Sequence, residues 1–320
     1  MKILVYIQQE NGKINPISTE ALVGAQKIIE KIGGSVSAVT FNSEAGNHLT
    51  SYNLQDIILI EDDQLNEFNP LFYVKAIESV IESESPDVVI LGHSYEARDW
   101  VPRLSARLDI PLISDCIGFN NDNNEGLTFT RSTYQGKLNS DISINSSKYI
   151  ISFQSGSFRV DDISLGNSII KKMDVDFSTI PNIIVPENKF QETAQAVDLT
   201  QAEVIISIGR GIGNEENIEM ARELTSLLNG ELASSRPVVD SGWLESARQV
   251  GSSGQTVSPK LYFAIGISGA IQHMVGMKSS KNIVAINKDK NAPIFESSDY
   301  GIVGDIFEVV PKLIETLKNN

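Results

Sequence analysis

The sequence predicts an α/β protein of two Rossmann-like domains with mainly parallel sheets, the first of which carries an antiparallel β extension. Three observations favour this prediction. Short, continuously apolar runs alternate with amphipathic helical segments over residues 1–120, and the same alternation restarts after residue 200. Between them, residues 127–158 change to strand-like alternation with Asn, Asp and Gly at the turns. The 320 residues are also enough for two hydrophobic cores.

The first half of the chain is expected to form strands and helices in turn. The predicted strands are 2–8, 35–41, 56–61, 87–92 and 111–119, and the predicted helices are 18–32, 70–84 and 97–108. Gly33 and Gly34 end the first of these helices. The antiparallel extension is predicted from three further strands, 128–134, 140–145 and 149–153.

The second half repeats this pattern. The predicted strands are 204–208, 231–235, 261–265 and 282–287, with a helix near 244–249. Asn214 can cap another helix, with Glu215 and Glu216 in its first turn at the positive end of the helix dipole. Asp305 opens the final helix, which accommodates Pro311 only in its first turn.

The domain boundaries follow from the stretch between the two halves. Residues 181–200 mix Pro, Asn, Glu and Gln with little periodicity, which is typical of a linker. We therefore expect an N-terminal domain over 1–190 and a second domain over 200–320.

Composition excludes several classes of protein. No run of about 18 apolar residues exists, so a membrane span is not expected. The N-terminus lacks the hydrophobic region of a signal peptide, and Cys116 is a single cysteine, which together favour a cytoplasmic protein. With only His48, His93 and His273 beside it, a metal centre is not expected.

The formal net charge of −15 argues against nucleic acid as a partner, because phosphate backbones require basic surfaces. An acidic, solvated surface is the simplest interpretation. A protein partner with a basic docking face is the other.

The most informative stretch runs over residues 260–288. Its apolar strand pattern breaks at Gly266 and passes through Ser268 and Gly269 into a short helical pattern before the next strand. Strand, glycine turn, helix and strand form a unit in which backbone N–H groups can hold a phosphate, because glycine lets the backbone approach it closely. Such turns also occur in proteins that bind nothing, so by itself this pattern is a weak indication of a nucleotide site.

Several motifs then carry a resemblance to a known family. The last third of the chain closely resembles the α subunit of electron-transfer flavoprotein, over LASSRPVVDSGW, QVGSSGQTVSPKLYFAIGISGAIQHMVGM, VAINKDKNAPIF and SSDYGIVGDIFEVVPKLIETL. The similarity continues more thinly through LGHSYEARDWVPRLSARLDIPLISD and ISIGRGIGNEENIEMARELTSLL. It implies a redox carrier that binds FAD and pairs with a β subunit on its first domain. The carrier would take electrons from flavoprotein dehydrogenases, such as acyl-CoA dehydrogenases, and pass them to a quinone oxidoreductase or the respiratory chain. It would need no catalytic acid, base or nucleophile.

The resemblance also implies which residues contact FAD. They are Arg210, Ser235, Arg236, Val250, Gly251, Ser252, Ser253, Ser268, Gly269, Ala270, Ile271, Gln272, His273, Asn287 and Asp305. Asn287 and Asp305 are assigned to the AMP half of FAD, although Asp305 is also an ordinary helix N-cap.

Three of these residues are expected to tune the flavin. Arg236 would place a positive charge beside the isoalloxazine ring and stabilise reduced, anionic flavin. Ser253 could hydrogen-bond flavin N5, although Ser252-Ser253 departs from the family's more usual Gln-Thr. His273 would meet the N1/O2 edge, as a neutral donor or as an imidazolium.

Two questions stay open at the level of sequence. His93, Ser94, Glu96, Arg98 and Asp99 form a polar cluster that could be a second nucleotide site or an acid/base set. We favour a structural role in which Arg98 and Arg103 pair with Asp99 and Asp109.

The alternative function is a nucleotide-binding enzyme or regulator that uses NAD or AMP without flavin redox. An electron-bifurcating member of the same family is a second alternative.

Overall fold

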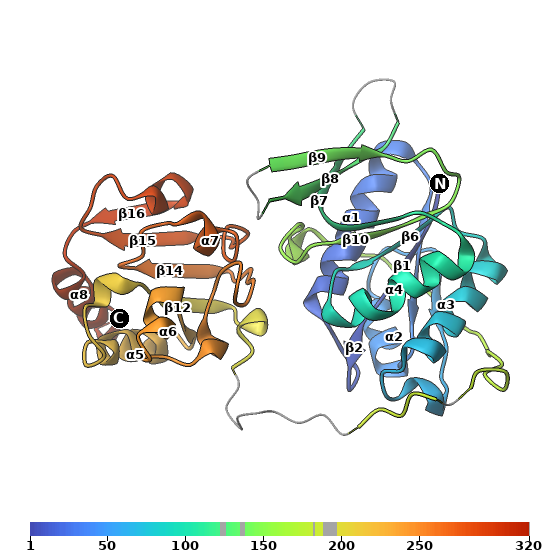
Figure 1. Ribbon diagram of the computed structural model, residues 1–320, viewed down its shortest axis with the longest axis horizontal. Helices are drawn as coiled ribbons and strands as arrows, with labels where there is room; N and C mark the ends of the chain where they lie inside the picture. Colours follow the sequence, from blue (N-terminus) through green and yellow to red (C-terminus); the bar gives the residue numbers. More distant parts are fainter. Residues whose placement is uncertain (122–125, 135–137, 182, 188–196, 320) are drawn as a thin grey trace. The chain divides into compact units, whose positions relative to one another are not determined.

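A computed structural model describes the chain except for residues 122–125, 135–137, 182, 188–196 and 320. The chain forms two units, Met1–Lys189 and Phe190–Asn320 (Figure 1). Each contains a mainly parallel sheet with helices, and the first also has an antiparallel part, so the predicted α/β class is confirmed. The stricter Rossmann-like description stays a prediction, as do the domain boundaries. The predicted linker falls partly outside the described residues.

The sheet of the first unit has nine strands in the order β11-β5-β4-β1-β6-β10-β7-β8-β9. They are β1 (Lys2–Tyr6), β4 (Ser35–Thr40), β5 (Ile57–Leu59), β6 (Val88–Gly92), β7 (Leu112–Asn120), β8 (Thr128–Thr133), β9 (Leu138–Ser143), β10 (Tyr149–Phe153) and β11 (Ile170–Lys172). Two pairings at one end of this sheet are antiparallel, β7 with β8 and β8 with β9, whereas the other pairings of its described strands are parallel. A separate small hairpin joins β2 (Gln9–Glu10) to β3 (Lys13–Ile14), and its turn residues Asn11 and Gly12 both have positive φ.

The prediction for β10 was wrong. We expected 149–153 to belong to the antiparallel extension, but β10 lies between β6 and β7 and pairs parallel to both. All five residues of β10 are buried, which is the property of a strand covered on both faces.

The helices cover both faces of the first sheet. They are α1 (Pro16–Ile32), α2 (Ser43–Leu49), α3 (Pro70–Glu84) and α4 (Tyr95–Leu108). α1 and α2 pack on one face, and α3 and α4 pack on the other. α1 begins two residues before its predicted start, because Asn15 Oδ1 accepts the amide of Ile17 and Pro16 fits the first turn. The short helix α2, capped by Asn42, was not predicted.

The sheet of the second unit has five parallel strands in the order β13-β12-β14-β15-β16. They are β12 (Val204–Ile208), β13 (Glu231–Ser234), β14 (Leu261–Ile265), β15 (Ile283–Asn287) and β16 (Tyr300–Val303). The helices are α5 (Ile218–Leu227), α6 (Arg236–Asp240), α7 (Ile271–Met274) and α8 (Ile306–Lys318). α5, α6 and α8 pack on one face, whereas loops and the end of α7 cover the other.

Two details of the second unit correct the prediction, and a third agrees with it. The helix expected near 244–249 is only a 3₁₀ turn, Ser246–Arg248, and the regular helix α6 lies before it. Asn214 does not cap α5; its Oδ1 accepts the amide of Asn217, which occupies the cap position, so Glu215 and Glu216 precede the helix. Asp305 opens α8 as predicted, with Oδ1 2.9 Å from the amide of Phe307.

Pro311 lies inside α8 and not in its first turn. Proline there removes one i→i−4 hydrogen bond. The buried side chains of Val310 and Ile314 hold the helix on the sheet in spite of this loss.

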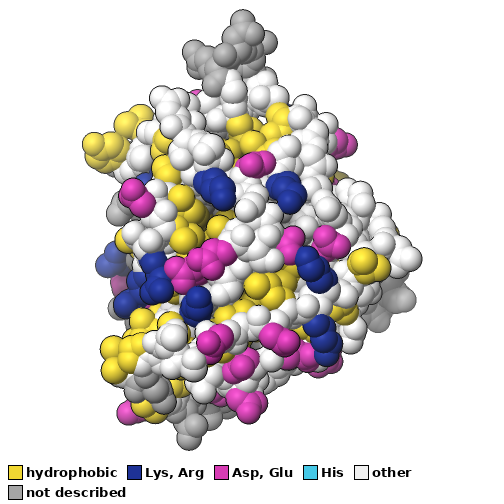
Figure 2. All heavy atoms as spheres, turned by 90° about the vertical axis from the view of Figure 1, so that its right-hand side faces the viewer, with side chains coloured by type: hydrophobic (Ala, Val, Ile, Leu, Met, Phe, Trp, Pro, Cys, Tyr) yellow, Lys and Arg dark blue, Asp and Glu magenta, His cyan; other side chains and the backbone are white. Residues whose placement is uncertain are grey.

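The surface carries both signs of charge. On the face drawn in Figure 2, Lys and Arg side chains are interspersed with Asp and Glu, and patches of hydrophobic side chains lie between them. Among the described residues, no helix combines the length and hydropathy that a membrane crossing requires.

Candidate functional site

The carboxyl edge of the second sheet is where its loops converge. β12 and β14 are neighbours in the sheet; the chain leaves β12 toward β13 on one side and leaves β14 toward β15 on the other. Open α/β sheets bind ligands at such a switch point. Here the loops touch through their backbones: a Cβ on Gly209 would lie 2.3 Å from the carbonyl oxygen of Gly266, and Gly211 N donates to that oxygen at 3.1 Å. Only glycine allows this approach.

A second contact joins the loop over residues 250–254 to α7. Gly251 has φ 143°, and a Cβ there would lie 2.7 Å from the carbonyl oxygen of Gln272. Val250 is 1% exposed and packs in the core, so it can offer a ligand only its backbone. Ser252 and Ser253 are exposed beside it.

Ser253 has a defined hydrogen-bond partner. Gln249 Nε2 lies 2.9 Å from Ser253 Oγ, and Gln249 itself is buried. Since an amide N–H can only donate, Ser253 accepts this bond and its own hydroxyl hydrogen remains available to another group. Gln249 was not among the predicted site residues, although it directly precedes Val250.

Two arginines lie at the same edge of the sheet. Arg210 is exposed in the 3₁₀ turn Arg210–Ile212 after β12. Arg236 opens α6 after the buried Ser235, and its Nε lies 3.4 Å from Asp240 Oδ2. Both side chains of this ion pair are more than half exposed, so the pair leaves the guanidinium accessible to a ligand.

His273 is buried on α7 and is only 6% exposed. Its Nε2 lies 3.0 Å from the hydroxyl oxygen of Tyr262 on β14. Its Nδ1 makes no hydrogen bond of regular geometry with a described residue, although a looser contact with the backbone of Val250 acts on it. Burial lowers the pKa of His273 to about 4, an effect that the Val250 backbone opposes, so the imidazole is neutral at pH 7. Of the two charge states considered from the sequence, burial favours the neutral one.

The remaining predicted residues follow β14, β15 and β16. Ser268 is exposed, and Ala270 caps α7, which begins at Ile271. Gly269 between them has φ 86°, and a Cβ added there would clash with the backbone nitrogen of Ile294. Asn287 braces this turn, because its Nδ2 donates to the carbonyl oxygen of Ile267 at 2.8 Å.

Asp305 lies beyond β16, where one carboxylate oxygen caps α8. The loops after β12 and β13 lie at the same edge. All the FAD contacts implied by the resemblance are therefore located at the carboxyl edge of the second sheet.

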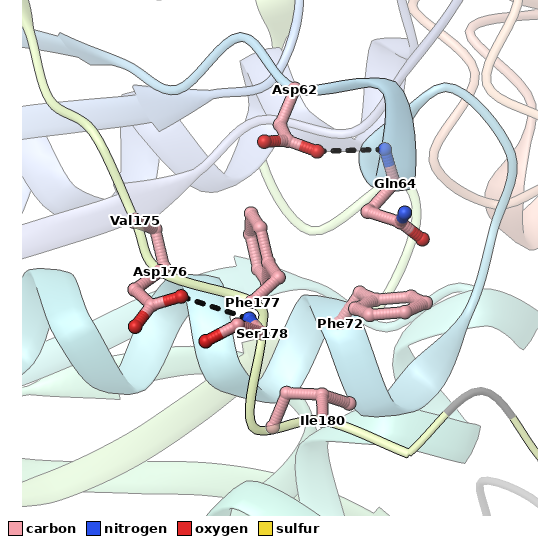
Figure 3. Close-up of a pocket in the computed structure, with 8 residues that line it drawn as sticks. All are labelled: Asp62, Gln64, Phe72, Val175, Asp176, Phe177, Ser178 and Ile180. Atoms are coloured by element: carbon pink, nitrogen blue, oxygen red, sulfur yellow. Dashed lines mark hydrogen bonds between the residues drawn. The ribbon is translucent and has the colours of Figure 1, made fainter.

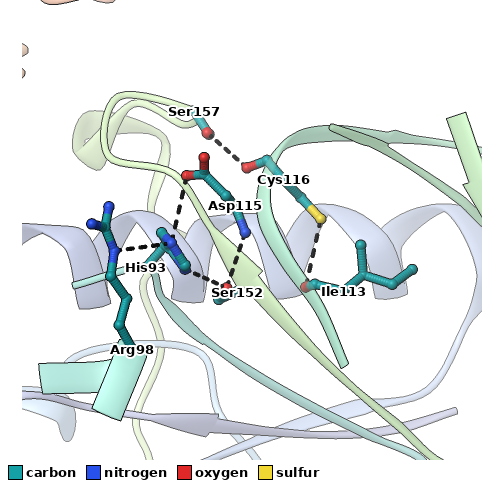
Figure 4. Close-up of polar contacts among 7 residues, drawn as sticks. All are labelled: His93, Arg98, Ile113, Asp115, Cys116, Ser152 and Ser157. Carbon is teal, nitrogen blue, oxygen red and sulfur yellow. Dashed lines mark hydrogen bonds and ion pairs between the residues drawn. The ribbon is translucent and has the colours of Figure 1, made fainter. Parts of the chain in front are cut away.

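The polar cluster of the first unit is a network of hydrogen bonds between neighbouring strands (Figure 4). His93 Nδ1 lies 2.9 Å from Ser152 Oγ, and the same hydroxyl accepts the amide of Asp115 at 3.1 Å. His93 directly follows β6, Ser152 lies within β10 and Asp115 lies within β7, so the cluster joins three neighbouring strands. Asp115 and Ser152 were not predicted; no local sequence pattern relates residues on separate strands.

One predicted ion pair is present and one is wrong. Arg103 Nη2 lies 3.1 Å from Asp99 Oδ1, as expected. Arg98 instead donates from Nε to His93 Nε2 at 3.1 Å, because it lies next to the histidine on the first turn of α4, while Asp109 ends that helix with φ 52°.

Burial lowers the pKa of His93; the Asp115 carboxylate opposes this effect and the nearby arginines add to it. Ser94 caps α4, and Glu96 accepts a hydrogen bond from Tyr6 Oη at 2.9 Å. Burial also raises the pKa of the Cys116 thiol to about 12, so the thiol is protonated at neutral pH.

A surface pocket of about 450 Å³ also lies in the first unit (Figure 3). Asp62 Oδ1 accepts the amide of Gln64, and Asp176 Oδ1 accepts the amide of Ser178, both at 2.9 Å. Both carboxylates therefore stabilise their own turns, and the hydrogen bonds to Ser178 lower the pKa of Asp176. Besides these two carboxylates, the described lining residues are Gln64 and Ser178 and the apolar side chains of Phe72, Val175, Phe177 and Ile180.

A parallel sheet with glycine-rich loops at its carboxyl edge is the arrangement that α/β domains use to bind nucleotide cofactors. Residues 198–278 match the family described as electron transfer flavoprotein FAD-binding domain, and residues 3–177 match the electron transfer flavoprotein domain. The chain belongs to the electron transfer flavoprotein α-subunit family, and its cofactor is FAD.

Similar proteins cover the whole chain. The electron transfer flavoprotein subunit alpha of Thermoanaerobacterium thermosaccharolyticum is 38% identical, over 99% of this chain and 97% of that protein. The protein of the same name from Bacillus subtilis is 34% identical with the same coverage. A third relative, the acryloyl-CoA reductase electron transfer subunit beta of Anaerotignum propionicum, is 31% identical over 99% of this chain and 95% of its own length.

The residues at the carboxyl edge fit FAD by their chemistry. Exposed guanidinium groups of Arg210 and Arg236 and the hydroxyls of Ser252 and Ser253 are donors suited to a diphosphate and to the carbonyl edge of a flavin. His273 adds an imidazole nitrogen that has no regular partner among the described residues.

Proposed function

We propose that this chain is the α subunit of a two-subunit electron-transfer flavoprotein. It accepts electrons from flavoprotein dehydrogenases and passes them to a quinone oxidoreductase or the respiratory chain. The observation that carries the proposal is the glycine-lined carboxyl edge within the stretch that matches the FAD-binding domain. When bound, FAD supplies reversible electron acceptance; the chain supplies binding, orientation and charge.

The proposed roles of the site residues follow from their positions. Arg210 holds a phosphate at the switch point, and Asn287 and Asp305 hold the AMP half of FAD. Arg236 provides a positive charge beside the isoalloxazine ring. The loops around Val250–Ser253, Ser268–Gln272 and Ser235 complete the site.

Ser253 takes the place of the family's more usual Thr at flavin N5. The hydrogen bond from Gln249 to Ser253 Oγ supports this role, because it turns the hydroxyl hydrogen away from Gln249 and leaves it free to donate. The adjacent Ser252 cannot supply the amide that the usual Gln would bring.

The partners belong to the same proposal. A β subunit packs on the first unit, and the complex serves dehydrogenases of CoA thioesters, including those of fatty acid β-oxidation. The acryloyl-CoA reductase named for one relative supports CoA-linked chemistry. An electron-bifurcating complex, with a second FAD held mainly by the other subunit, is the second candidate.

The absorbance spectrum of the complex tests this function. The chain should be co-expressed with the β subunit and purified without added flavin. Flavin bands that bleach on addition of an acyl-CoA substrate and its dehydrogenase are expected. A colourless complex would favour a nucleotide-binding protein without flavin redox. Bleaching by NADH alone would favour the bifurcating form.

A further inference from the structure

A buried tyrosine lies directly behind His273. The hydroxyl oxygen of Tyr262 is 3.0 Å from His273 Nε2, and their ring centroids are 6.1 Å apart. Tyr262 is 0% exposed, on a strand whose residues after Leu261 are all buried. We propose that Tyr262 donates its hydroxyl hydrogen to His273 Nε2 and thereby fixes the imidazole as the Nδ1–H tautomer. This inference rests on the proposed function only for its consequence at the flavin.

The direction of the hydrogen bond follows from the surroundings. A phenol that accepted from His273 would have to donate its own hydrogen elsewhere, and Tyr262 lies in a cluster of aliphatic side chains. Ser207 is the nearby polar side chain, and against the larger rise caused by burial a loose hydrogen bond with its hydroxyl lowers the pKa of Tyr262. Its Oγ is buried and makes no regular hydrogen bond with a described residue. Donation from Tyr262 to His273 satisfies the phenol without Ser207.

Both partners are neutral, so a single hydrogen lies between the phenol oxygen and Nε2. Either group can donate it, and the direction of donation sets the tautomer of His273. Burial raises the pKa of Tyr262, which keeps the phenol protonated. Burial also lowers the pKa of His273 to about 4, so that at pH 7 only one ring nitrogen carries a hydrogen. With Nε2 accepting from the phenol, that hydrogen is on Nδ1.

The tautomer decides the sign of the interaction that His273 can make. An Nδ1–H group donates and stabilises negative charge, whereas an unprotonated Nδ1 presents a lone pair and repels it. Because negative charge grows at the N1/O2 edge of a flavin on reduction, the Nδ1–H form would raise the reduction potential relative to the other form. Tyr262 touches no reacting atom and is a positioning residue.

Nitrogen NMR of the full chain tests the tautomer without any flavin. The sequence has three histidines, so a ¹⁵N-histidine sample gives few signals, and His48→Gln and His273→Gln assign them. We expect His273 to show a protonated Nδ1 and an unprotonated Nε2 at pH 7. In Tyr262→Phe, which keeps the ring and removes the hydroxyl, part of the signal should move to the Nε2–H form. Tyr149→Phe, another buried tyrosine in the first unit, should leave His273 unchanged. An Nε2–H signal in the wild type, or no change in Tyr262→Phe, overturns the proposal.

The flavin potential of the αβ complex tests the consequence. Tyr262→Phe should lower the midpoint potential in an otherwise wild-type chain and should have no further effect in His273→Gln, because the phenol acts through the imidazole. An effect of equal size in both backgrounds would overturn the positioning role. A complex without FAD would count against the proposed function, whereas the tautomer measured on the chain alone stands or falls by itself.

Discussion

The backbone amide of Ser252 donates a hydrogen bond of 2.7 Å to the carbonyl oxygen of Gln272. It ties the loop over residues 250–254 to α7, and with it two groups of proposed flavin contacts that lie on different segments of the chain. Gly251, next to Ser252, is the residue that permits this approach.

Replacing Gly251 by Ala should therefore disturb both segments. The new Cβ would meet Gln272 O at 2.7 Å, at a φ of 143° that L-residues avoid. Strain of this kind costs on the order of 1–3 kcal/mol. We expect a lower free energy of unfolding in urea and a reduced FAD-to-protein ratio in the purified complex.

Gly242→Ala is the matched control, because Gly242 has φ 75° and no atom within 4 Å of the added Cβ. It should cost only the backbone strain and leave FAD occupancy intact. Equal losses of FAD in both variants would show that the contact between Gly251 and Gln272 has no special role.

Replacing Arg236 by Ala should lower the flavin potential, because the reduced, anionic flavin loses a nearby cation. A change of about 1.4 kcal/mol corresponds to roughly 59 mV for one electron. Since the side chain is 68% exposed, solvent screening makes about one such step the upper end of the expected drop. Potentiometric titration of the complex measures it.

Two further variants control this measurement. Asp240→Asn removes the carboxylate beside Arg236 and should shift the potential upward. Arg222→Ala removes an exposed charge from α5 and should have no effect. A potential that rises or stays constant in Arg236→Ala would contradict the placement of Arg236 beside the isoalloxazine ring.

Stability should fall as the pH drops below about 6.5. The folded-state pKa values of His93 and His273 are lowered by burial, so the unfolded chain binds more protons in this window. The two histidines contribute fully to the free energy of unfolding above the unfolded-state pKa of about 6.5. This contribution is lost as the pH falls toward the folded-state pKa. With His273 at about 4, the loss by pH 4.5 amounts to roughly 2–3 kcal/mol from this residue.

Urea unfolding at pH 7, 6, 5 and 4.5 checks the sign. His273→Gln should flatten the curve in this window, whereas replacement of the exposed His48 should not. Stability that rises on acidification to pH 5 would contradict the neutral, buried state of both histidines.

The chain expressed alone should hold FAD poorly and should co-purify with a β subunit when the two are expressed together. The reason is that, in the proposed complex, the partner completes the cofactor site. Size-exclusion chromatography with absorbance detection measures both properties. A monodisperse monomer that is fully loaded with FAD would be incompatible with this assembly.

Periodicity predicted those parts of the fold in which one side-chain pattern dominates. The helix over 70–84 agrees with α3, whose buried residues recur with the helical period, and the strand over 204–208 agrees with β12, which is a continuous, almost fully buried run. The error at β10 has a physical cause. Tyr149–Phe153 follows a hairpin in sequence, but its continuous burial requires a place between two strands, and local patterns do not encode which neighbours a strand takes.

The loops at the carboxyl edge could be predicted from their glycines and polar residues, whereas the residues that contact FAD were chosen from the resemblance and stay a prediction. The partners behind these loops could not be predicted. Tyr262 looks like an ordinary residue of an apolar strand, and Gln249 like a residue of a short helix; their hydrogen bonds to His273 and Ser253 exist only after the chain has folded. α6 was missed because its five residues are too few to show a helical period.

The insertion of β10 between β6 and β7 also restricts the order in which the first unit can form during synthesis. A nascent chain that ends before Tyr149 contains β6 and β7 but not the strand that separates them, and each would expose an unpaired apolar edge. Final pairing of the sheet centre must wait for a distant segment, which makes folding slow relative to chains with local contacts. Ribosome-bound fragments truncated before residue 149 should therefore depend on chaperones, whereas fragments extended past β11 should be able to release them.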